Sequence, residues 1–209
     1  MLKAISAAAV LAAALVAPAT AAQAVPPPDR MVIDVVSANG SGCPDDTAVV
    51  TVSPDNTAFT ISYSQYTAQV GVGAPPTAFR MNCQIGLNVH VPQGFTYAIA
   101  SAQYRGFAHV ESGAYGSESA NYYFQGEPQS TKIRHNFYGP LDNDWQANDY
   151  VGIGALSFLR CGERRYLNIN TELRLSAGTS NRWTTTSLLT MDSTDASLDT
   201  IYHVAWRHC

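Results

Sequence analysis

The chain has few charged residues, and those it has do not cluster in the sequence. Asp, Glu, Lys and Arg make up 13% of its 209 residues, whereas about 25% is usual for a soluble domain. The formal net charge is −4. Proteins that bind nucleic acid or anionic membranes carry a basic surface. The composition therefore argues against nucleic acid and against a lipid surface as partners.

Long apolar segments are also scarce, except at the N-terminus. Residues 4–24 contain no charge, follow Lys3 and end in small residues with repeated Ala-x-Ala spacing. The most apolar part, residues 5–16, is shorter than the roughly 20 residues that span a bilayer. Residues 1–24 therefore predict a secretory signal peptide, cleaved near Ala21 to Ala24, and an extracellular or cell-wall location. No later segment is long enough to span a membrane, so we expect no membrane anchor after cleavage.

Cysteine is limited to four residues, Cys43, Cys83, Cys161 and Cys209. The number is even, and a secreted protein meets an oxidising environment, so we expect all four to form disulfides. No Cys-x-x-Cys pair is present, which argues against zinc binding and thiol redox chemistry. Of the three pairings possible, we favour Cys43–Cys83 and Cys161–Cys209, which join neighbours in sequence.

Helical periodicity is missing after the signal peptide, and apolar and polar residues alternate instead with a period of two. Residues 25–30 form a Pro-rich extended lead. The clearest alternation lies in residues 166–176, where one set of side chains is expected to face the core and the other to face solvent. The first set is Leu167, Ile169, Leu173 and Leu175, and the second is Asn168, Asn170, Glu172 and Arg174. Further strands are expected at 31–38, 47–52, 57–66, 84–92, 95–99, 154–160, 182–192 and 200–209.

Turn-forming residues between these segments favour hairpin connections. Residues 92–94 (PQG) are expected to join the strand at 84–92 to the one that starts at Phe95. Residues 161–165 (CGERR) are expected to join 154–160 to 166–176 in the same way. Short strands joined by hairpins predict an all-β fold. We expect residues 31–209 to form a single antiparallel β-sandwich, jelly-roll-like or a flattened barrel, stapled by two disulfides.

The segment 39–44 (NGSGCP) combines several signals. Gly40-Ser41-Gly42 lacks the spacing of a nucleophile elbow, which also requires a following helix. Asn39 satisfies the rule for N-glycosylation, which matters only if the producing cell glycosylates. The Asn-Gly and Ser-Gly pairs and Pro44 are turn formers. We therefore expect this segment to be a loop that Cys43 pins to a neighbouring strand.

Acidic residues occur in groups that suggest one metal site. Asp142 and Asp144 lie close together, and Asp192 and Asp195 form a later group. Calcium takes six to eight oxygen ligands, so calcium at an Asp142/Asp144 loop is the one cofactor that we consider. The alternative is that these residues cap turns through their own backbone. Five glutamates are nominal candidates for a glycosidase, but no pair stands out: Glu111, Glu118, Glu127, Glu163 and Glu172.

Aromatic residues crowd the middle of the chain, from Tyr104 to Tyr150. Exposed Tyr and Trp side chains can stack on sugar rings, but Tyr is also a common residue of β-sheets. Packing within the sheets is the expected role for most of these rings. Trp145 lies in an acidic, turn-rich segment, and we expect it to be exposed.

Several segments, in this order, resemble one family. They are GSGCP, FTISYSQYTAQVG, RMNCQIGLNVHVPQGFTYAI, QYRGFAHVESG, YYFQGE, FYGPLDNDW, LRCGERRYLNINTELRL, MDSTD and the final WRHC. The chain resembles the domain of unknown function 4360 family, small secreted proteins of bacteria and fungi, from about Gly42 to Cys209. The resemblance implies a secreted, disulfide-bonded β protein. It implies no activity, because the family has no assigned catalytic residues.

The resemblance also draws attention to Tyr104, Arg105 and Gly106. A glycine allows a backbone or ligand to approach closely, and the neighbouring guanidinium could hold a carboxylate. Tyr104, Arg105 and Trp145 are therefore our candidate binding residues. The alternative is that Arg105 pairs with a sheet neighbour such as Glu111 or Asp142.

These observations favour a non-enzymatic extracellular or cell-wall-associated protein that binds a glycan or another protein through polar, Tyr-rich loops. The alternative is a secreted hydrolase whose active site assembles from distant strands. A concave pocket with two acidic residues, or with His and Asp, within hydrogen-bond reach would favour the hydrolase. A third hypothesis, an inhibitor or toxin-like effector, predicts an exposed, rigid loop with an apolar tip.

Overall fold

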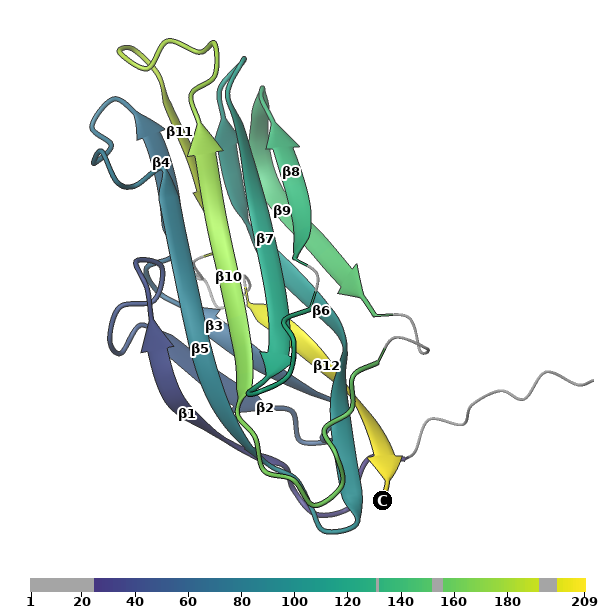
Figure 1. Cartoon of the computed structure of the whole chain (residues 1–209). Helices are drawn as coiled ribbons and strands as arrows, with labels where there is room; N and C mark the ends of the chain where they lie inside the picture. The colour runs from purple at the N-terminus through teal and green to yellow at the C-terminus, as the bar shows by residue number, and fades with distance from the viewer. Residues whose placement is uncertain (1–24, 131, 152–155, 192–198) are drawn as a thin grey trace, which may run out of the picture.

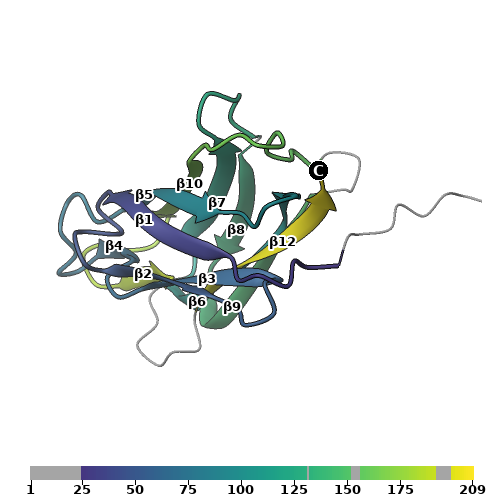
Figure 2. The same ribbon diagram turned by 90° about the horizontal axis from the view of Figure 1, so that it is seen from below.

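The protein is an all-β sandwich. A computed structural model describes residues 25–130, 132–151, 156–191 and 199–209, which form twelve strands and no helix. The strands make two antiparallel sheets that pack face to face without closing into a barrel (Figures 1 and 2). The predicted sandwich stapled by two disulfides is therefore confirmed. The described part of the chain contains no helix with the length and hydropathy needed to cross a membrane.

The first sheet has five strands. Their spatial order is β1 (Val32–Asn39), β5 (Arg80–His90), β10 (Leu167–Ser176), β7 (Tyr115–Phe124) and β8 (Ile133–Tyr138). Strand β10 is central, with β5 on one side and β7 on the other. Asn170 lies opposite Gln84 on β5 and opposite Asn121 on β7.

The second sheet has seven strands. Its order is β2 (Ala48–Val52), β3 (Ala58–Tyr63), β12 (Thr200–His208), β6 (Phe95–Val110), β11 (Thr186–Thr190) and β4 (Thr67–Gly71), and β9 (Leu141–Tyr150) pairs with β6. The long strand β6 thus bonds to three neighbours, β12, β11 and β9.

Two predicted hairpins are wrong. Strand β5 bonds to β1 and β10, and both of its edges are therefore occupied, so the chain crosses to the other sheet before it forms β6. The strand predicted at 154–160 is replaced by irregular backbone over residues 156–160, while 154–155 lie outside the described residues. Leu159 is buried there, and its N–H donates to the carbonyl of Tyr97 at 3.1 Å. Its apolar character therefore reflects packing against β6 and not a strand.

The core confirms the predicted alternation. Ile85 and Leu87 of β5, and Leu167, Ile169 and Leu173 of β10, are all buried. The five largest fully buried side chains of the described residues are tyrosines, namely Tyr63, Tyr66, Tyr97, Tyr104 and Tyr202. The ring of Tyr202 stacks on Phe59 with centroids 5.1 Å apart. The chain therefore combines few charged residues with a core in which many aromatic rings carry a hydroxyl group.

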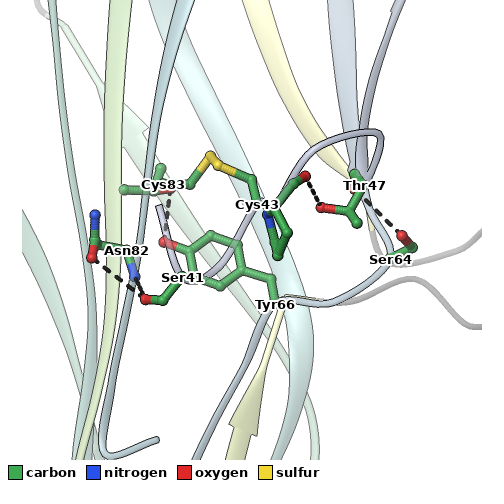
Figure 3. Close-up of a disulfide and its surroundings, with 9 residues drawn as sticks. Ser41, Cys43, Thr47, Ser64, Tyr66, Asn82 and Cys83 are labelled. Carbon is green, nitrogen blue, oxygen red and sulfur yellow. Dashed lines mark hydrogen bonds between the residues drawn. A yellow bond between two sulfur atoms is a disulfide. The ribbon is translucent and has the colours of Figure 1, made fainter. Parts of the chain in front are cut away.

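Both favoured disulfide pairings are confirmed: Cys43 bonds to Cys83 and Cys161 to Cys209. Figure 3 shows how the segment 39–44 lies against β5 around the first of them. The N–H of Gly42 donates to the carbonyl of Asn82 at 2.9 Å, and the N–H of Asn82 donates to Ser41 Oγ at 3.2 Å. A side chain at Gly42 would overlap the ring of Tyr66. Ser41 therefore has a structural partner, and the loop is pinned as predicted.

Removal of the two disulfides should have unequal effects on stability. Their half-cystines are 40 and 48 residues apart, so chain entropy assigns about 4 kcal/mol to each. Cys43 and Cys83 are buried, whereas Cys161 and Cys209 are exposed. We expect Cys43→Ala with Cys83→Ala to lower the free energy of unfolding more than Cys161→Ala with Cys209→Ala, because the first pair also loses core packing. Urea unfolding measures both losses, and equal losses would contradict this expectation.

Candidate functional site

The tertiary structure places two of the predicted binding residues in the core. Tyr104 is 0% exposed and Trp145 is 8% exposed. The expectation that Trp145 is exposed is therefore wrong. Trp145 lies opposite Gly106 on β6, where a Cβ would overlap its ring, and it packs on Phe137 with centroids 4.8 Å apart. The missing side chain at Gly106 allows Trp145 to pack against β6. Neither the Tyr104 ring nor the Trp145 ring is on the surface, where it could contact a ligand.

Arg105 is separated from these two rings because it projects from the other face of β6. Its Nη2 donates to Oε1 of Gln103 at 2.7 Å. The pairing considered with Glu111 or Asp142 is not formed, because both acidic groups lie beside His109 instead, at 3.4 and 3.1 Å. The candidate binding residues Tyr104, Arg105 and Trp145 therefore do not lie on one surface.

The acidic residues considered for calcium lie on a strand and not in a loop. Asp142 and Asp144 are exposed on β9. Among the described residues, no group of three or more His, Cys, Asp or Glu side chains is placed to hold a metal ion. Asp192 and Asp195 lie outside the described residues. Calcium at Asp142 and Asp144 stays a prediction.

A polar cluster lies between the two sheets. Asp149 of β9 accepts a hydrogen bond from the Tyr104 hydroxyl at 3.1 Å and lies 2.7 Å from Nε2 of His135 on β8. Glu118 of β7 is directly opposite His135 and fully buried. Among the described residues, neither carboxyl oxygen of Glu118 has a hydrogen-bond partner. Burial, and then the charge of Asp149, raises the pKa of Glu118 well above its ordinary value.

A groove with many polar side chains lies on the outer face of the five-stranded sheet. It has a volume of about 370 Å³. The floor comes from β5, β10 and β7, and one side comes from the segment between β7 and β8. The lining residues are Arg80, Asn82, Cys83, Gln84, Asn121, Tyr123, Gln129, Ser130, Lys132, Asn170, Thr171 and Glu172. Nearly all are polar, and they bring together donors, acceptors and one aromatic ring.

Glu172 is the electrostatic centre of this groove. It is 5% exposed, although it projects from the outer face of β10 as predicted. Nε of Arg80 and Nε of Arg174 each donate to its carboxylate at 2.7 Å, and Nζ of Lys132 lies 3.4 Å away. Burial alone would raise the pKa of Glu172, but the hydrogen bonds from Arg174 and Arg80 hold it below its ordinary value. Glu172 is therefore an anion that fixes three cations.

Amide groups supply the rest of the groove floor. The side-chain oxygen of Asn170 is buried and, among the described residues, has no hydrogen-bond partner. Nδ2 of Asn121 donates to Oε1 of Gln129 at 3.3 Å, and Ser130 Oγ accepts the N–H of Tyr122 at 3.0 Å. These two bonds hold the segment after β7 against the sheet, where it forms the wall of the groove.

Tyr123 lies where the groove meets a second, more apolar hollow of about 420 Å³. This hollow is lined by residues that include Ile99, Phe124, Tyr150 and Leu167. Neither hollow is lined by Glu118, Asp149 or His135. Among the described residues, His135 and Asp149 form the only His–Asp contact inside the sandwich. This contact does not open into either hollow.

Sequence analysis assigned two of the groove residues, Asn170 and Glu172, to the correct face but did not join them to the others as a site. Asn170, Glu172 and Arg174 were expected to face solvent, and the alternating Arg80, Asn82 and Gln84 were not considered. Two strands with polar residues at every second position are the signal that could have suggested a polar floor. Which strands pair side by side is decided by the fold.

The fold and the groove together define a two-sheet, disulfide-stapled β-sandwich with a polar groove on its five-stranded sheet. The chain belongs to the family described as domain of unknown function DUF4360, whose model matches residues 29–209. The resemblance predicted from the sequence is thereby confirmed.

A relative from Arthroderma benhamiae, named an uncharacterized secreted protein, is 37% identical over 184 residues. The match covers 88% of this chain and 74% of the relative. The protein is secreted, as predicted. The signal peptide at residues 1–24 lies outside the described residues and stays a prediction.

Solved structures are similar only in a limited way. The enzymatically active domain of bacteriophage CBA120 tailspike protein 4 has 15% identity and a TM-score of 0.28, and the match covers 86% of this chain but 19% of the tailspike chain. TmCBM61 in complex with β-1,4-galactotriose has 10% identity and a TM-score of 0.29, with 83% of this chain and 88% of that one covered. At these TM-scores, neither likeness carries an argument about function.

Replacement of Glu118 should change how stability depends on pH. The folded state holds a proton on Glu118 that the unfolded chain releases once the pH exceeds the ordinary value of 4.5. The stability that Glu118 contributes is therefore complete below that pH, and it is lost as the pH rises towards the elevated pKa of the folded state. One such proton makes the free energy of unfolding fall by up to about 1.4 kcal/mol for each pH unit.

We expect Glu118→Gln to reduce this decline in the free energy of unfolding between pH 5 and 7. Urea unfolding at several pH values and constant ionic strength measures the slope. Glu118→Met, which also cannot ionise, is the companion variant and should reduce the slope as well. A wild-type slope in both variants would show that Glu118 is not the group responsible.

Proposed function

We propose that this secreted protein binds a polysaccharide through the groove on the outer face of its five-stranded sheet, and that it does so without enzymatic activity. The observation that carries the proposal is the composition of the groove. Amide side chains from three adjacent strands, the two cations Arg80 and Lys132, and the Tyr123 ring line a single hollow of about 370 Å³. Small-molecule sites have volumes of roughly 300–1,000 Å³.

The chemistry of the floor suits sugar hydroxyl groups. A hydroxyl both donates and accepts hydrogen bonds, and an Asn or Gln side chain offers both functions in return. Gln84, which lies opposite Asn170 on this floor, is exposed and offers both a donor and an acceptor to a ligand hydroxyl.

Tyr123 adds the apolar contact that a sugar ring requires. Its side chain lies beside Asn168 at the end of the groove and borders both hollows. Aromatic rings bind ligands through large, rigid surfaces, and the hydroxyl group remains available for a hydrogen bond. An extended polysaccharide could therefore lie along β10, with one ring on Tyr123 and its hydroxyls over the amides.

The groove supports binding better than hydrolysis. A glycosidase uses two carboxyl groups about 5–10 Å apart on either side of the bond that it cleaves. Glu172 is the one acidic side chain among the described residues that line the groove, and three cations occupy it. Glu118 and Asp149 lie inside the sandwich. The hydrolase alternative therefore has no pair of carboxyl groups in the groove.

A second candidate function, binding to an extracellular protein, is favoured by the loop between β10 and β11. Trp183 is 80% exposed there, and Arg182 stacks on its ring at 5.2 Å. Asn181 fixes the loop, because its carbonyl accepts the N–H groups of Thr184 and Thr185 and its side chain accepts that of Trp183. This is the exposed, rigid loop with an apolar tip that the effector hypothesis predicts.

A binding assay on insoluble cell-wall polysaccharides, with and without added calcium, tests the proposal. We expect the double variant Asn121→Ala, Tyr123→Ala to lose about 30-fold in affinity, because it loses one stacking contact and one set of hydrogen bonds. Trp183→Ala removes an exposed ring far along the chain from the groove and should bind like the wild type.

Three outcomes would contradict the proposal. Wild-type protein could be retained by none of the polysaccharides under either condition. The groove variant could bind as well as the wild type. If Trp183→Ala lost binding and the groove variant did not, the contact would instead be assigned to the loop between β10 and β11.

A further inference from the structure

We propose that the polysaccharide bound in the groove is acidic, with carboxylate groups on its sugar rings, as in a uronic-acid polymer. This inference rests on the proposed function and names its ligand class. It arises from an imbalance of charge on the outer face of the five-stranded sheet, which the net charge of the whole protein conceals.

Four cations gather on this face. Arg80, Lys132 and Arg174 contact Glu172, and Arg134 projects from the same face of β8, opposite Ser119. They are four of the twelve Lys and Arg residues in a chain whose net charge is −4. Among the described groove residues and these four cations, Glu172 is the one anion. The face therefore carries excess positive charge, while the rest of the chain carries more negative charge than positive.

The cations keep donors available for a second anion. The side chains of Arg80, Lys132 and Arg174 are 46%, 42% and 50% exposed, whereas that of Glu172 is 6% exposed. Each guanidinium has five N–H donors and an ammonium has three, more than one carboxylate can accept. Glu172 thus holds the three cations in place, while a large part of each of their side chains remains exposed to solvent.

This preorganisation favours a carboxylate on a sugar. Arginine binds a planar carboxylate through two parallel hydrogen bonds, and side chains that are already held lose little entropy on binding. The adjacent amides and Tyr123 would meet the neutral part of the same sugar. A densely charged polyanion such as a nucleic acid fits less well, because it would extend from the groove over a surface with excess negative charge.

The test compares oligosaccharides of one length that differ in charge. Hexagalacturonate, its fully methyl-esterified form and a neutral galactose hexamer are titrated into the full secreted protein by isothermal calorimetry. EDTA is present so that calcium cannot cross-link the acidic chains. We expect hexagalacturonate to bind at least tenfold more tightly than its ester, and the difference to shrink as salt is added.

Charge-removing variants locate the interaction. Lys132→Gln removes a cation that lines the groove, together with its 3.4 Å contact to Glu172, and Arg134→Gln removes a cation from the same face of β8. Each should weaken hexagalacturonate binding about tenfold and leave the affinity for the ester unchanged. Arg105→Gln removes the same charge from the outer face of the other sheet, where Arg105 donates to Gln103, and should bind like the wild type.

Each contrary result has a distinct meaning. Equal affinity for the acid, the ester and the neutral hexamer would overturn the acidic ligand class and leave the proposed function intact. Tighter binding of a sulfated hexamer than of hexagalacturonate would make sulfate the recognised group and overturn the assignment to a carboxylate. Wild-type affinity in both Lys132→Gln and Arg134→Gln would overturn the role of the groove cations. Absence of binding to every polysaccharide tested would overturn the proposed function itself.

Discussion

The alternation of side chains along β10 determines both the core and the groove. Residues 167, 169, 171, 173 and 175 face the second sheet, and Asn170 and Glu172 between them form the middle of the groove floor. A shift of one residue would place Glu172 in the core and Leu173 on the surface. Because β5 and β7 bond to β10 on either side, their outward side chains, such as Asn82 and Asn121, are aligned by the same register. The site is thus a consequence of the strand pairing that builds the sandwich.

Two buried glutamates show how the protein accommodates carboxyl groups that are removed from water. Removal of an anion from water is costly unless cations or hydrogen-bond donors replace the solvent. Glu172 lies among three cations, which keep its pKa low. Glu118 lies on the inner face among tyrosines, and its pKa is raised because burial and the charge of Asp149 outweigh the opposing charge of Lys132. The first arrangement orders charged groups at the surface, and the second places a neutral acid in the interior.

The disulfide between Cys43 and Cys83 connects the start of the chain to this surface. Cys83 lines the groove, and its neighbour Asn82 is held by Ser41 and Gly42 (Figure 3). The segment 39–44 therefore fixes the end of β5 at which Asn82 and Arg80 reach the groove. Its glycines are required by close packing on Tyr66 and Asn82 and not by catalysis. The disulfide stabilises the fold and the edge of the candidate site together.

The sequence by itself determined the all-β class, the two faces of β10, both disulfides and the family, because these depend on local periodicity, on cysteine spacing in an oxidising environment and on ordered motifs. Only the tertiary structure decided which strands are neighbours, because pairing between distant segments depends on how the two sheets pack. That pairing replaced the predicted β5–β6 hairpin, buried Trp145 and Tyr104, and separated Arg105 from both. It also brought Arg80 and Lys132 from two separate segments to Glu172, which is already beside Arg174 on β10. A search for runs of basic residues could not find this cluster, since Arg80 and Lys132 reach it from distant parts of the chain.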